Sequence, residues 1–106
     1  MTRAHAPDGG LVMPEPKVLR PEVQMFAAAM EKELRENDHK GGWRNCSNGY
    51  LLRRVGQEVG ELRRALSDLA RTPDDEGLRA RVLGEAADVA NFAMMLADNA
   101  DAMDRG

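Results

Sequence analysis

The chain has few of the residues on which several protein classes depend. Its 106 residues include only one Trp, one Tyr, two Phe, two His and one Cys. The single cysteine, Cys46, forms no disulfide within the chain and has no partner at the spacing of zinc ligands. These shortages exclude a disulfide framework and a structural zinc site, and they favour a reducing compartment.

Charge and hydropathy exclude two further classes. The net charge is −3, and no block of Lys and Arg indicates binding to nucleic acid. No apolar run of transmembrane length is free of acidic residues, and no signal-peptide core lies near Met1. We therefore expect a cytoplasmic protein that has neither a membrane nor a nucleic acid as partner.

The residues that are abundant favour one small all-α domain. Many Ala, Leu and Met side chains are typical of helices, and the length suffices for a single modest core. Residues 1–20 contain prolines and glycines without an apolar period, so we expect a flexible N-terminal arm followed by a helical domain over 21–104. A first helix is predicted from Pro21 to Asn37, with the charged residues 31–36, Glu33 among them, on a solvated face.

Two longer helices should follow and pack as an antiparallel hairpin. The first, over 51–70, is expected to be capped by Ser47 or Asn48, and Thr72 is expected to cap the next. A heptad-like apolar stripe is formed by Leu52, Val55, Val59, Leu62, Leu66 and Leu69. Residues 82–97 are apolar almost all round, so we expect this helix to be largely buried.

Four acidic residues lie at matching places on these two helices. Glu58 and Glu61 on one helix, and Glu85 and Asp88 on the other, stand at about 60° and 120° from the apolar stripe of their own helix. In a hairpin the four carboxylates can converge, which is tolerable only around divalent cations. No histidine accompanies them as in di-iron bundles, and all-oxygen ligands favour Mg²⁺ or Mn²⁺.

The alternative is that these acids form ordinary surface ion pairs. Three of them have an arginine three or four residues away on the same helix: Arg54, Arg64 and Arg81. Asp88 has no such neighbour, since Gly84 and Phe92 stand four residues from it. The apolar surroundings of Asp88 favour the metal interpretation.

The connection over residues 37–48 has the composition of a binding loop. Gly41 and Gly42 permit positive φ or a close backbone approach, Lys40 and Arg44 can meet phosphate, and Trp43 can stack on a base. The alternative is a helix C-cap at Gly41, with Trp43 packed onto the core. The loop alone does not decide between the two.

The acidic motifs resemble those of a known family. Gln57-Glu58-Val59-Gly60-Glu61 and Glu85-Ala86-Ala87-Asp88 look like the EExxE…ExxD signature of the MazG-like all-α nucleoside triphosphate pyrophosphohydrolases. This superfamily includes the dimeric dUTPases and the phosphoribosyl-ATP pyrophosphohydrolases. The resemblance runs over about residues 25–99 and is greatest to the compact members that phages encode.

The resemblance implies Mg²⁺-dependent hydrolysis of a nucleoside triphosphate between the α and β phosphates, which gives a monophosphate and pyrophosphate. The metal ligands carry over to Glu58, Glu61, Glu85 and Asp88, of which Glu58 and Glu61 are the catalytic candidates. The first Glu of EExxE is Gln57 here, so a general base at that position is absent. Our candidates for substrate binding are Lys40, Trp43, Arg44 and Asn91.

A homodimer or a dimer of dimers is also expected. Three helices are too few to cover the apolar surface, whereas two hairpins can pair into a four-helix-bundle core. Within enzymes, the alternative is a relative with a narrower substrate, dUTP or phosphoribosyl-ATP. Outside enzymes, it is a non-enzymatic helical dimerisation module.

Overall fold

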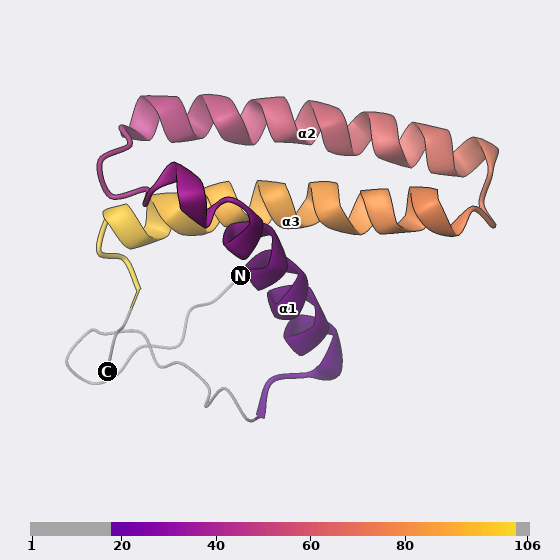
Figure 1. Ribbon diagram of the computed structural model, residues 1–106, viewed down its shortest axis with the longest axis horizontal. Helices are drawn as coiled ribbons and strands as arrows, with labels where there is room; N and C mark the ends of the chain where they lie inside the picture. Colours follow the sequence, from indigo (N-terminus) through magenta and orange to yellow (C-terminus); the bar gives the residue numbers. More distant parts are fainter. Residues whose placement is uncertain (1–17, 104–106) are drawn as a thin grey trace, which may run out of the picture.

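The computed structural model describes residues 18–103, and this part of the chain is all-helical. It consists of α1 (Pro21–Glu36), a short 3₁₀ helix η2 (Asp38–Lys40), α2 (Asn48–Arg71) and α3 (Glu76–Asn99). Figure 1 shows α2 and α3 side by side and antiparallel, with α1 crossing α3. The predicted all-α class and the hairpin are therefore confirmed. Most of the arm expected over 1–20, and residue 104 of the expected domain, lie outside the described residues.

The helix boundaries follow from local capping. Pro21 is the first residue of α1, as predicted. Ser47 caps α2, because its hydroxyl accepts a hydrogen bond from the backbone N–H of Tyr50 at 3.1 Å. The prediction that Thr72 caps the last helix is wrong. The N-cap is Asp75, whose carboxylate accepts from the backbone N–H of Leu78 at 3.0 Å, while Thr72 ends α2.

The face of α2 that meets α3 is offset by one residue from the predicted stripe. Leu51, Glu58 and Ala65, seven residues apart, are the buried residues of α2. Leu52, Val59 and Leu66 follow them by one position and are 60%, 38% and 50% exposed. One residue is about 100° of rotation on a helix, so the apolar arc is wider than a single partner helix covers.

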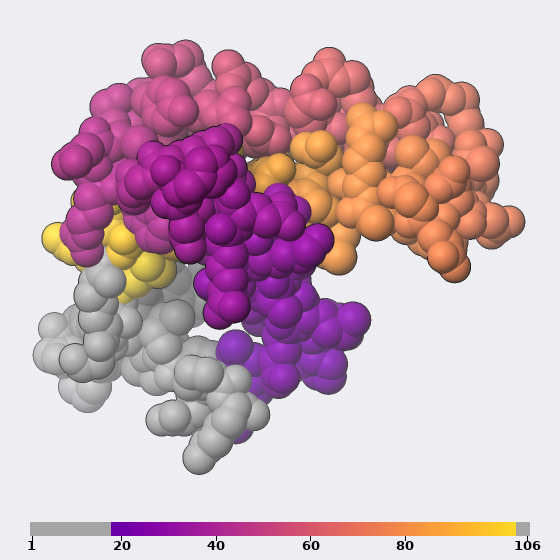
Figure 2. Space-filling view, in the orientation of Figure 1, coloured from indigo at the N-terminus to yellow at the C-terminus, as the bar shows by residue number. Residues whose placement is uncertain are grey.

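Within a single chain, residues 82–97 are only partly buried, and burial of the whole stretch would need the expected second chain. Within this stretch only Ala87 and Asn91 are buried, and Leu83 is 48% exposed. α1 packs on α3 near one end of the hairpin, and Figure 2 shows that the other end lies clear of it. No helix of residues 18–103 has both the length and the hydropathy that a membrane span needs.

Candidate functional site

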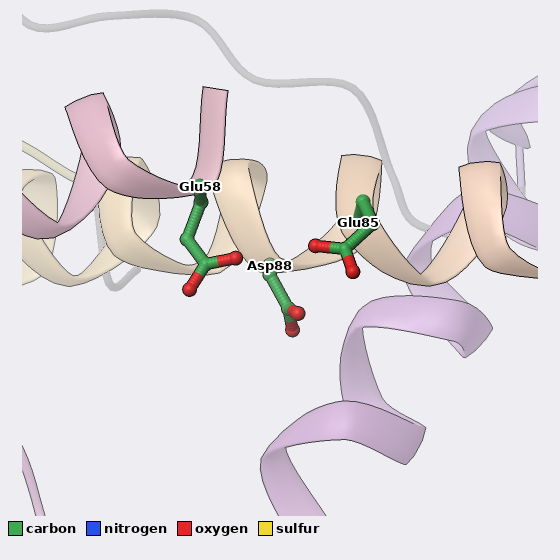
Figure 3. A group of neighbouring side chains, drawn as sticks. All are labelled: Glu58, Glu85 and Asp88. Carbon is green, nitrogen blue, oxygen red and sulfur yellow. The ribbon is translucent and has the colours of Figure 1, made fainter. Parts of the chain in front are cut away.

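Three carboxylates meet where α2 and α3 pack together. Glu58 of α2 and Glu85 and Asp88 of α3 can each offer one oxygen such that these atoms all lie within 4.8 Å of one another. Figure 3 shows the three side chains converging on the same space from the two helices. Glu58 is buried, and the two acids of α3 are half-buried. Carboxylates at this separation repel one another unless protons or cations neutralise them.

The pKa values of Asp88 and Glu85 are raised, in part by that repulsion. Burial raises the pKa of the Asp88 carboxyl from its ordinary 3.8 to about 6, and the carboxylates of Glu33, Glu58 and Glu85 contribute to the rise. Burial also raises the pKa of Glu85, and the negative charges of Glu58 and Glu61 add to that effect. Perturbed acids of this kind are characteristic of sites that bind ligands or metals.

Glu61, the fourth predicted ligand, lies at the edge of the cluster. It is not among the three acids whose oxygens converge, and its carboxylate accepts a hydrogen bond from Arg64 instead. On the helix it stands about 60° further from the α3-facing side than Glu58 does. The structure therefore brings three of the four predicted ligands together and leaves the fourth near enough to influence Glu85.

A different carboxylate, Glu33 of α1, approaches the cluster from the other side. It is half-buried, faces the same pocket as Asp88, and contributes to the raised pKa of that acid. Its Oε1 would lie 3.4 Å from a Cβ added to Gly84, so the glycine leaves room for it. Placing Glu33 on a solvated face was therefore wrong. Its position three residues after Met30, beside the apolar stripe of α1, is the signal that was missed.

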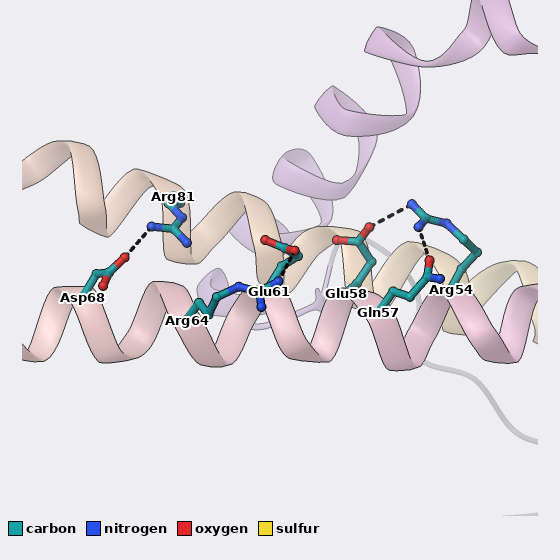
Figure 4. A network of polar contacts seen from close by, with 7 residues as sticks. All are labelled: Arg54, Gln57, Glu58, Glu61, Arg64, Asp68 and Arg81. Atoms are coloured by element: carbon teal, nitrogen blue, oxygen red, sulfur yellow. Dashed lines mark hydrogen bonds and ion pairs between the residues drawn. The ribbon is translucent and has the colours of Figure 1, made fainter.

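The ion pairs of the alternative interpretation are also present in part. Arg54 donates to Glu58 at 2.9 Å, and Arg64 donates to Glu61. Arg81 does not form the ion pair with Glu85 that the alternative interpretation allowed. It donates to Asp68 of α2 at 2.8 Å and so links the two arms of the hairpin (Figure 4). The acidic cluster is thus flanked by Arg54 and Arg64, which pair with Glu58 and Glu61.

A pocket of about 370 Å³ opens beside the acids. Its walls come from α1, the 37–48 connection, α2 and α3, and include Glu58 and Asp88. The lining includes two of the predicted substrate-binding residues, Lys40 and Asn91. It also includes the aromatic side chains of Tyr50 and Phe92, which were not predicted to bind substrate. Arg44 is exposed and is not part of the lining.

Trp43 is docked on the end of α3 and does not line the pocket. Its indole Nε1 donates to Asp98 Oδ2 at 2.9 Å, and its backbone carbonyl accepts from Asn99 Nδ2 at 3.0 Å. The side chain is half-buried, which agrees with the packing alternative for this residue. Gly41 has φ 91°, so the positive φ expected of the glycines is present at this position.

Asn91 connects the site to α1. It is only 4% exposed, and its amide nitrogen donates to the backbone carbonyl of Met30 at 3.0 Å. Its amide oxygen has no hydrogen-bond partner among the described residues. A buried acceptor without a donor costs free energy, so a bound group that supplies one would be favoured here.

Comparison of the chain with protein-family models, with curated proteins and with solved structures gave no match.

Proposed function

We propose that this protein is a Mg²⁺-dependent nucleoside triphosphate pyrophosphohydrolase, which releases pyrophosphate by attack at the α phosphate. The observation that carries the proposal is the convergence of Glu58, Glu85 and Asp88 beside a pocket that also contains Lys40. These acids occupy the positions of the ExxE and ExxD motifs. A solvated ion-pair face would not bring three carboxylates of two helices into one partly buried space.

The donor set fits a hard divalent cation. Carboxylate oxygens without His or Cys favour Mg²⁺ or Mn²⁺, and a bound cation would relieve the repulsion that raises the pKa of Asp88. Glu58, Glu85 and Asp88 would hold it, while Glu61 and Glu33 add negative charge near Glu85 and Asp88. When bound, such an ion would neutralise negative charge on the triphosphate and help to orient the attacking water.

The pocket has room for the remainder of a nucleotide. Its volume of about 370 Å³ lies within the range of small-molecule sites. Lys40 can contact phosphate, and Tyr50 or Phe92 offers an aromatic face to a base. In this proposal the base-stacking role moves from Trp43 to these two residues, while Asn91 remains a candidate for contact with substrate. Arg44 lies outside the lining, and a contact with substrate there would require the loop to move.

The exposed apolar seam supports the homodimer. Leu52, Val59 and Leu66 form a seven-residue repeat on the free side of α2, which is the pattern of helices that pair. Two hairpins joined along it would give the four-helix core of a dimer or a dimer of dimers. A non-enzymatic dimerisation module would explain this seam equally well. It would not explain the buried Glu58 at the acidic cluster.

The proposal is tested by incubating the protein with Mg²⁺ or Mn²⁺ and a nucleotide panel that includes dUTP and phosphoribosyl-ATP. We expect equal amounts of monophosphate and pyrophosphate, and no reaction with EDTA. The variant Glu85→Gln should be inactive, whereas Asp74→Asn, which removes an exposed acid of the α2–α3 turn, should keep wild-type activity. Orthophosphate plus diphosphate as products would contradict attack at the α phosphate.

A further inference from the structure

Arg54 is a cation placed inside the acidic site. Its Nη2 donates to Glu58 Oε1 at 2.9 Å, and its Nη1 donates to the amide oxygen of Gln57. Its Cζ lies 4.9 Å from the centroid of the Phe92 ring, a cation–π distance. Figure 4 shows the guanidinium joined to both partners, and the residue lines the same pocket as Asp88. Three contacts therefore fix its orientation.

Arg54 has one charged and one neutral hydrogen-bond partner on its own helix. Of its two hydrogen-bonded partners on α2, Glu58 is a carboxylate and Gln57 is a neutral amide. A glutamate at position 57 would give the guanidinium a second carboxylate partner. Arg54 and Lys40 are the two basic side chains among the described residues that line the pocket.

We propose that Arg54 is a phosphate-binding residue of this site, and that Gln57 keeps it available for that role. The inference rests on the proposed function, in which Glu58 binds a divalent cation. Once Glu58 is shared with a metal, less of its negative charge is available to Arg54, and the planar guanidinium fork suits two phosphate oxygens. Phe92 would hold the guanidinium plane in place during that exchange.

This arrangement makes Arg54 act in opposite directions on the two ligands. The guanidinium competes with a metal for Glu58, because both are positive and both need the same carboxylate. It attracts phosphate, because its donors are pre-oriented. A residue that only supported the fold would affect both ligands in the same direction.

The test measures two affinities by isothermal titration calorimetry, that of Mn²⁺ alone and that of inorganic pyrophosphate in the presence of Mg²⁺. For Arg54→Gln we expect pyrophosphate affinity to fall roughly tenfold or more, as for the loss of a charged hydrogen bond. Mn²⁺ affinity should stay equal or increase. The matched control is Arg53→Gln, which removes the same charge from the exposed neighbouring position, where the arginine lies over Tyr50. We expect it to change neither affinity by more than about twofold.

Two further variants keep the test decisive if Arg54→Gln does not fold. Gln57→Glu retains the arginine but supplies a second carboxylate, so it should also weaken pyrophosphate binding several-fold. Arg54→Lys keeps the charge without the fork and should give an intermediate loss. Pyrophosphate affinity unchanged in Gln57→Glu would overturn the inference.

The possible results separate this inference from the proposed function. If Arg54→Gln binds pyrophosphate as Arg53→Gln does, or loses Mn²⁺ and pyrophosphate together, Arg54 is not a phosphate ligand, whatever the nucleotide panel shows. If wild type hydrolyses no nucleotide but pyrophosphate binding still depends on Arg54, the proposed function fails and the anion site stands. A wild-type protein that binds no pyrophosphate overturns the inference.

Discussion

Replacing Asp88 by Asn should make the metal-free protein more stable while removing its activity. The raised pKa of Asp88 means that folding brings its negative charge into an unfavourable place. Asn has nearly the same shape and no charge, so the variant should fold without that repulsion. Most substitutions lower the stability of a protein, so a gain in stability from a substitution that keeps the side-chain shape is informative.

The size of the gain follows from the pKa. A rise from 3.8 to about 6 is roughly two units, and each unit corresponds to about 1.4 kcal/mol between charged and neutral forms. Because Asp88 is only half-buried, solvent screening reduces this to about 1–2 kcal/mol. For a domain of this size, such a difference raises the melting temperature by roughly 5–10 °C.

The sign of the pH dependence is fixed by the same shift. Below about pH 4 the carboxyl is neutral in both the folded and the unfolded wild type, so the repulsion is absent there. As the pH rises from about 4 to 6, the unfolded chain ionises first and wild-type stability falls. The advantage of Asp88→Asn should therefore be full at pH 7.5 and should disappear near pH 4.

The assay is thermal unfolding followed by circular dichroism in EDTA, repeated with Mg²⁺. Mg²⁺ should raise the melting temperature of wild type, because it binds the folded state, and should have a smaller effect on Asp88→Asn. Asp74→Asn, an exposed acid removed from the helix connection, is the control and should change the melting temperature little. A variant no more stable than wild type at pH 7.5 in EDTA would refute the account of crowded charge.

Three other predictions concern the loop, the pocket and the seam. Trp43→Phe, which loses the indole hydrogen bond, should lower the free energy of unfolding by about 1 kcal/mol and leave nucleotide affinity within twofold; a lost affinity with unchanged melting would restore base stacking by the indole. Tyr50→Ala should weaken nucleotide binding by about 1–3 kcal/mol without affecting pyrophosphate binding, and equal losses of affinity for both ligands would contradict stacking. Val59→Glu with Leu66→Glu should shift sedimentation towards monomer, whereas Met25→Glu, on exposed α1, should not; an active wild-type monomer would refute the homodimer.

Much of the fold could be predicted because it depends on local signals. Pro21 and Ser47 fix helix starts through short-range geometry, and the apolar periods of α2 and α3 require an antiparallel partner. Thr72 and Asp75 compete for the same turn, and only the backbone shows that Thr72 already ends α2. The choice between neighbouring capping residues was therefore open at the level of sequence.

The candidate site was predictable where it depends on one helix and less so where several helices meet. The spacing of Glu85 and Asp88 places them together on α3 whatever the tertiary structure. The position of Glu33 beside the apolar stripe of α1 indicates partial burial, but its approach to Asp88 depends on how α1 crosses α3. The same holds for Trp43, because its partner Asp98 lies 55 residues away in the chain.

The docked loop gives the protein its own optical reporter. Trp43 is the only tryptophan in the sequence, so all indole emission comes from the junction between the loop and α3. Lys40, on the wall of the pocket, lies only three residues before it. If the loop leaves α3 when a ligand enters or departs, the indole passes from a half-buried hydrogen bond into water and its emission moves to longer wavelength. Stopped-flow fluorescence of the unlabelled chain can then time that movement separately from the release of product.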